Sequence, residues 1–258
     1  LVEAAKNTPS YRGLENYELS DKEKSIIDDQ DLTAAQKAFI KRVYPILIRY
    51  QDKYKYNAMI VMSMIIQENS LDADNDLFTV AHNILSIKAP RDYNGPTFDA
   101  PTWEQYDGTG ERTIIENETW IKFESDEACI LYFVEHLLGL KAYDDAQTFH
   151  KSPELFVMGL LNDMKKNGDV DEAHHLGATS YATALNYVYG TLILSSQYGL
   201  DKMGPDNYRV GYDWSAKTTD GFIIPNQVRG NAFYHAANTK YAGEIGKGPR
   251  ATIFASVA

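Results

Sequence analysis

A run of nine residues, AMIVMSMII at 58–66, is apolar except for Ser63. A helix formed by this run would have no polar face, so the rest of the fold must bury it on all sides. About 20 such residues would be needed to cross a bilayer, and the run therefore predicts a core helix and no membrane span. It leads directly into Gln67, Glu68 and Asn69. The sequence thus places a carboxylate at the end of a buried helix.

Helices that surround this core are predicted from their end signals. Ser20 and Thr33 are each followed three residues later by Glu or Gln, the pattern of a capping box in which two backbone N–H groups are satisfied reciprocally. Apolar residues at helical spacing after Thr33 predict an amphipathic helix with a kink at Pro45. Further end signals predict helices after Ser125, from Ser152-Pro153 to Asn167-Gly168, and from Tyr187 to Tyr198.

Glycine and proline interrupt the helical pattern in a middle segment. Residues 89–112 contain Pro and Gly at a spacing that breaks any helix, which predicts loops around a small hairpin. Residues 204–258 have no sustained periodicity, so we expect a loop-rich tail or linker there. We therefore divide the chain into a polar leader with a short helix at 1–33, one helical domain at 34–203, and the tail at 204–258. The leader and the tail suit a domain that belongs to a larger protein.

Composition narrows the classes of function. The chain has 258 residues, of which 44% are hydrophobic, enough for one large packed core. Its net charge of −11 argues against nucleic acid, because binding to a phosphate backbone needs clustered Lys and Arg. Cys129 is the only cysteine, so there is neither an internal disulfide nor a cysteine-based metal cluster.

Glu68 is the best candidate for a catalytic residue. At the end of a buried helix, desolvation would disfavour the ionised carboxylate and keep the proton on it, as a general acid requires. The alternative is a carboxylate that simply reaches water at a helix end. The residues around Glu68 do not decide between these two interpretations.

Several consecutive blocks resemble one family. They are FIKRVYPILIRYQDKYKYNAMIVMSMIIQENS, HNILSIK at 82–88, YNGPTFDAPTWEQYDG at 93–108, TWIKFESDEACILYFVEHLL and YATALNYVYGTLILSSQYGL. In this order, over roughly residues 35–202, they resemble glycoside hydrolase family 73, the bacterial N-acetylglucosaminidases of the lysozyme-like superfamily that cut peptidoglycan. The resemblance implies an α+β, mainly α, lysozyme-like domain with a small β-hairpin lobe near 97–123 that flanks a cleft.

The resemblance also implies the catalytic residues. Glu68 falls on the family's catalytic glutamate and Tyr187 on its active-site tyrosine. Glu104 matches the second carboxylate, on the hairpin, with Glu116 as the reserve. Three stretches depart from the family pattern. Asn69-Ser70-Leu71-Asp72 replaces a small residue, an aromatic and a glycine, Ser86-Ile87-Lys88-Ala89 replaces the GIKG block, and Ala184-Leu185 replaces the Asp-Pro before the tyrosine.

The expected reaction needs a proton for the leaving oxygen and control of positive charge at the anomeric carbon. Glu68 would supply the proton. Glu104 would activate water or stabilise the oxocarbenium-like transition state, or the substrate's own acetamido group would act as the nucleophile, with Tyr187 orienting that group or the water. These routes stay open.

Substrate contacts are assigned to Tyr93, Trp103 and Asn83, since flat aromatic faces suit sugar rings. Trp120 is expected in the core.

No metal or cofactor is expected. The DADND stretch at 72–76 begins like a calcium loop, but Leu77 occupies the position that needs glycine. His174 and His175 are adjacent and would diverge, which makes them poor ligands for one zinc ion.

The expected partner is the glycan strand of peptidoglycan, and the expected location is extracellular, wall-associated or phage virion-associated. Two alternatives remain: a muramidase or lytic transglycosylase on the same fold, and a non-catalytic wall-binding or phage-tail module.

Overall fold

The computed structural model describes residues 14–72, 74–104, 113–139, 143–153, 155–157, 159–160 and 190–209, without the side chains at 103–104, 113–116 and 145. The described elements are mainly helices with one two-stranded antiparallel sheet, as expected for a mainly α, α+β fold. They are η1 (Leu14–Asn16), α2 (Asp21–Asp28), α3 (Ala34–Tyr54), α4 (Ala58–Asn69), α5 (Asp76–Thr79), β1 (Thr97–Glu104), β2 (Thr113–Ile121), α6 (Asp126–His136), α7 (Asp144–Thr148), η4 (Leu200–Lys202) and η5 (Asp206–Tyr208). Helical backbone is also described at 190–197.

The predicted helix starts at Ser20, Thr33 and Ser125 are confirmed, whereas the start predicted at Tyr187 lies outside the described residues. Ser20 and Thr33 are the N-caps of α2 and α3, and both capping boxes are complete. Ser125 caps α6, where its side chain accepts the N–H of Ala128. Gly199, just after the helix at 190–197, has a φ of +69°, the left-handed conformation that commonly follows a helix end.

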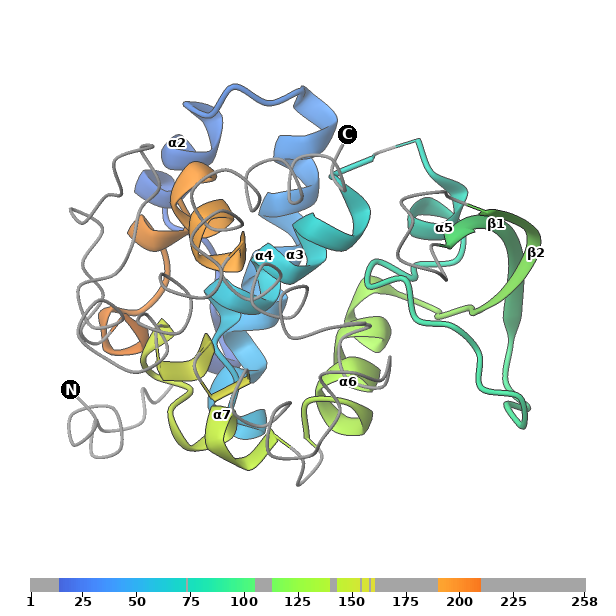
Figure 1. Ribbon diagram of the computed structural model, residues 1–258. Coiled ribbons are helices and arrows are strands. Elements are labelled where there is room, and N and C mark those ends of the chain that lie inside the picture. The colour runs from blue at the N-terminus through green and yellow to red at the C-terminus, as the bar shows by residue number, and fades with distance from the viewer. Residues whose placement is uncertain are drawn as a thin grey trace, which may run out of the picture.

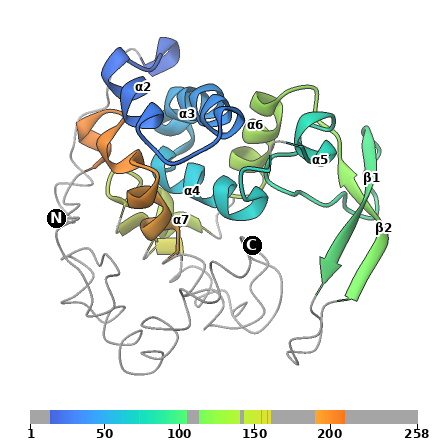
Figure 2. The same ribbon diagram turned by 90° about the horizontal axis from the view of Figure 1, so that it is seen from above.

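The apolar run forms α4, which lies in the middle of the helical body with α3, α6 and α7 around it (Figures 1 and 2). Every residue of α4 except Glu68 is buried. The core predicted from the run is therefore confirmed. None of the helices in the described part of the chain is long and apolar enough to cross a membrane.

The predicted hairpin is the sheet of β1 and β2, which projects from one side of the helical body beside α5 (Figure 1). Thr97 pairs with Ile121 at its base and Glu104 with Thr113 at its far end, and a register shift lies between Ala100 and Thr102. Lys88 forms a single bridge to Trp120 on the other edge of β2. Trp120 is buried, as expected.

The described parts of the predicted leader (1–33) and tail (204–258) both pack in the same unit as the predicted domain. Leu14, Leu19 and Ile27 of the leader belong to the core. In the tail, the backbone N–H of Gly204 donates to Glu23 over 2.7 Å, and Tyr208 is buried. The packed unit therefore extends beyond 34–203 in both directions.

Candidate active site

Glu68 is exposed, although it lies between the buried residues Gln67 and Asn69. Of the two interpretations of Glu68 left open by the sequence, burial of the carboxylate is therefore wrong, and the carboxylate reaches water. The last turn of α4 brings this one position to the surface, while its neighbours stay in the core. The arrangement gives a solvent-accessible acid on an otherwise buried, and therefore well-fixed, helix.

The chain reverses sharply just after Glu68. Ser70 and Leu71 have φ angles of +51° and +53°, so two consecutive residues that are not glycine adopt the left-handed conformation. Such conformations are costly for L-residues and tend to occur at functional sites, where the surrounding structure holds them. Ser70 N–H still donates to Ile66 O over 2.8 Å, which closes the last turn of α4.

The segment at 81–88 connects this end of α4 to the hairpin. Asn83, predicted to bind substrate, is fully buried. Its Nδ2 donates to the carbonyls of Ile87 and Ile121, each over 2.8 Å, and its Oδ1 accepts the N–H of Ile87 over 2.8 Å. Since the amide is used inside the protein and has no exposed surface, Asn83 joins the segment to β2 and is not available to a substrate.

The hairpin carries both candidates for the second carboxylate. Glu104 is the last residue of β1, and Glu116 lies on β2. Their side chains, and that of Trp103, are outside what the structure describes, and Tyr187 lies outside the described residues altogether. At the base of the hairpin, Lys88 Nζ forms an ion pair of 2.9 Å with Glu118 and lies 5.8 Å from the centre of the Trp120 ring.

Tyr93 is half-buried and packs against the core at the hairpin base. A Cβ atom at Gly95 would lie 2.3 Å from its hydroxyl oxygen, so the glycine leaves room for the phenol. Next to it, burial and the nearby Tyr93 raise the pKa of Tyr132. The ring of Tyr132 lies 5.5 Å from that of Phe123 and 4.6 Å from that of His136, between centroids. Phe123, Tyr132 and His136 thus form an aromatic cluster near Tyr93 that the sequence did not indicate.

A second unpredicted cluster centres on Asp126, in the first turn of α6. Its buried carboxylate accepts from Arg42 Nε at 2.7 Å and lies 3.0 Å from His82 Nδ1. These contacts join α3, the 81–88 segment and α6. No local sequence pattern indicates this cluster, because Arg42 and His82 are distant from Asp126 in the chain.

The helix at 190–197 packs on α4, where Ser195 meets Ser63 in the middle of α4. Further along the chain, Met203 lines a small cavity together with Met59, near the start of α4.

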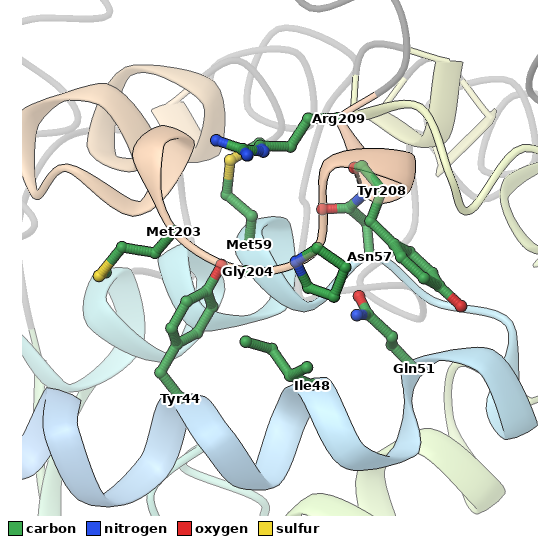
Figure 3. Close-up of a pocket in the computed structure, with 10 residues that line it drawn as sticks. Tyr44, Ile48, Gln51, Asn57, Met59, Met203, Gly204, Tyr208 and Arg209 are labelled. Atoms are coloured by element: carbon green, nitrogen blue, oxygen red, sulfur yellow. Dashed lines mark hydrogen bonds between the residues drawn. The ribbon is translucent and has the colours of Figure 1, made fainter. Parts of the chain in front are cut away.

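A small cavity lies at the opposite end of α4 from Glu68. It encloses about 10 Å³ between α3, the start of α4 and residues 203–209 (Figure 3). Within the described residues, Gln51 Nε2 and Arg209 Nε line it without a hydrogen-bond partner. This volume is that of about one water molecule, far below the ~300 Å³ or more of a ligand pocket, so the cavity is no sugar site.

Comparisons with known proteins give structural matches only: no family model and no curated protein matches the chain. A C-terminally truncated glycoside hydrolase domain of Salmonella typhimurium FlgJ is similar with a TM-score of 0.47 and 18% identity, over 66% of this chain and 99% of that one. A peptidoglycan hydrolase mutant from Sphingomonas sp. A1 has a TM-score of 0.47 and 16% identity, over 63% and 97%. The catalytic domain of the Listeria monocytogenes autolysin Auto has a TM-score of 0.39 and 17% identity, over 74% and 97%.

Proposed function

We propose that the chain is a peptidoglycan hydrolase that cleaves the β-1,4 bond between N-acetylglucosamine and N-acetylmuramic acid, that is, an endo-β-N-acetylglucosaminidase. The observation that carries the proposal is the placement of Glu68. It is the exposed residue of a helix that is otherwise buried, directly before a strained reversal of the chain. A carboxylic acid fixed in this way and open to a polymer is suited to protonate a glycosidic oxygen.

Because Glu68 is exposed, its protonated form would be favoured by the bound substrate and not by the fold alone. In the free protein the carboxyl group is exposed to water. A glycan strand bound over Glu68 would displace that water and disfavour the ionised carboxylate. Protonation would then be coupled to substrate binding.

The second role in the reaction is assigned to Glu104, at the end of β1. It would activate the attacking water or stabilise the oxocarbenium-like transition state. The acetamido group of the substrate is the other source of a nucleophile, in which case Tyr187 would orient that group or the water.

Tyr93 and Trp103 are proposed to contact the sugar rings. Tyr93 is only half-buried, and it lies near the aromatic cluster of Phe123, Tyr132 and His136. Contacts of this type do not depend on positive charge, so the net charge of −11 is compatible with a glycan as partner. The proposed location is outside the cell, at the wall or on a virion.

The test compares wild type with Glu68→Gln on purified peptidoglycan. General acids contribute about 100- to 10,000-fold to rate, so the substitution should lower turnover by at least 100-fold. Glu18→Gln, an exposed glutamate between η1 and α2, is the matched control and should retain full activity. Retention of activity within tenfold by Glu68→Gln would remove the acid assignment.

Mass analysis of the released fragments tests the bond that is cut. Reducing-end N-acetylglucosamine supports the proposal. Reducing or anhydro muramic acid ends would instead identify a muramidase or a lytic transglycosylase. Wild-type protein that sediments with walls but releases no fragments would be a binding module.

A further inference from the structure

Asn69, the last residue of α4, makes two side-chain hydrogen bonds at the point where the chain leaves the helix. It is 3% exposed. Its Oδ1 accepts the N–H of Leu71 over 2.8 Å, and its Nδ2 donates to the carbonyl of Ile84 over 3.4 Å. The residue therefore contacts both the reversal after Glu68 and the segment at 81–88.

The first hydrogen bond stabilises a left-handed backbone conformation, which residues other than glycine rarely adopt. Ser70 and Leu71 both have positive φ angles, and neither is glycine. The Oδ1 bond to Leu71 forms an Asx turn, and the carbonyl of Asn69 also accepts the N–H of Asp72 over 2.9 Å. Leu71 is buried, so this turn also directs its side chain into the core. Asn69 thus determines where α4 ends, one residue after Glu68.

The second hydrogen bond reaches toward the hairpin. Ile84 belongs to the same segment as Asn83, whose amide holds the carbonyls of Ile87 and Ile121. Ile121 is the last residue of β2. A continuous series of buried hydrogen bonds therefore runs from the residue next to Glu68 to the base of the hairpin that carries Glu104.

We propose that Asn69 is a positioning residue, which fixes the carboxyl group of Glu68 relative to the β1–β2 hairpin. This inference rests on the proposed function, because it assigns Glu68 as the acid and Glu104 as the group that acts with it. Asn69 itself is buried and does not touch the substrate. Its effect is on alignment, for which an error of about 1 Å can cost 100-fold in rate.

The test measures kcat and KM on peptidoglycan fragments for Asn69→Ala and Asn69→Ser. Asn69→Ala removes both side-chain hydrogen bonds, so kcat should fall about 10- to 100-fold while KM stays within about twofold. Asn69→Ser keeps a side-chain oxygen that can accept from Leu71 N–H, and should recover part of kcat. If Asn69→Ala does not fold, a lowered kcat in folded Asn69→Ser carries the test.

Asn75 offers a matched control, because it makes the same type of turn at the start of α5 and is not adjacent to Glu68 in the sequence. Its Oδ1 accepts the N–H of Leu77 over 2.9 Å, as the N-cap of α5. Asn75→Ala should lower the melting temperature but leave kcat within twofold below that temperature. Equal losses of kcat in Asn75→Ala and Asn69→Ala, or a wild-type kcat in Asn69→Ala, would overturn the inference. Activity of Glu68→Gln would instead overturn the proposed function.

Discussion

The hydroxyl oxygens of Ser63 and Ser195 lie 2.7 Å apart in the core, although 132 positions separate them in the sequence. Ser63 Oγ also lies 3.0 Å from the Met59 carbonyl, and Ser195 Oγ lies 2.7 Å from the Thr191 carbonyl. The two hydroxyls have only two protons for these three contacts. Since the Met59 contact is the longest, we infer that Ser63 donates to Ser195 and Ser195 donates to Thr191.

This pair should couple α4 to the helix at 190–197. Replacing either serine with alanine removes the shared hydrogen bond, and we expect each single variant to lose about 1 kcal/mol of unfolding free energy. The double variant should lose about 0.5 to 1 kcal/mol less than the sum, because the same bond is counted in both single variants. Urea denaturation of the four proteins measures the coupling. Strict additivity would show that the pair does not interact.

The protein should become more stable when Ser86 is replaced by glycine. Its φ is +50°, in the left-handed region that favours glycine. The left-handed conformation costs an L-residue about 1–2 kcal/mol, which glycine avoids at a smaller cost in unfolded-state entropy. We therefore expect Ser86→Gly to raise the unfolding free energy by about 0.5 to 1 kcal/mol.

Ser25 provides the control for this change, since it is exposed within α2. Ser25→Gly should lower the unfolding free energy, because glycine disfavours a helix interior by roughly 0.5 kcal/mol relative to serine. Chemical denaturation distinguishes the two variants by the sign of the change. A loss of stability in both would mean that the conformation at Ser86 is not strained.

Two buried groups give opposite dependences of stability on pH. Burial lowers the pKa of His150 from 6.5 to about 4, and burial raises the pKa of Asp201 from 3.8 to about 6. Between pH 6.5 and 4 the unfolded chain takes up a proton at His150 before the folded chain does, so stability falls as the pH falls. At Asp201 the folded chain takes up the proton first, so stability rises as the pH falls from 6 to 3.8.

These contributions, each on the order of 3 kcal/mol, nearly cancel in the wild type. Replacing one of the two residues should therefore expose the pH dependence that the other one contributes. Asp201→Asn should lose stability more steeply than wild type from pH 6.5 to 4, and His150→Asn should lose it less steeply or gain it. The measurement is the unfolding free energy of the three proteins across this pH range. Parallel curves for all three would contradict the assigned pKa directions.

The helical frame could be predicted because its signals are local. The capping boxes at Ser20 and Thr33 and the apolar run of α4 depend on residues within one or two turns of each other. The hairpin followed from glycine and proline positions, although its exact strands did not.

The exposure of Glu68 and the burial of Asn83 could not be predicted in the same way. Glu68 is exposed because of where the last turn of α4 points, and this depends on the left-handed residues Ser70 and Leu71. Asn83 is buried because Ile121, 38 positions later, accepts its amide proton. The ion pair of Asp126 likewise needs Arg42, which lies 84 positions earlier in the sequence. Contacts at such separations leave no periodic pattern in the sequence.

The two hairpin glutamates give the last prediction. Glu104 is the final residue of β1, opposite Thr113, whereas Glu116 lies within β2 near the register shift. If Glu104 assists the reaction, Glu104→Gln should lower kcat by at least 100-fold, and Glu116→Gln should stay near wild type. The reverse result would transfer the role to Glu116. Wild-type turnover in both variants would favour nucleophilic assistance by the acetamido group, which a substrate lacking that group would test by failing to react.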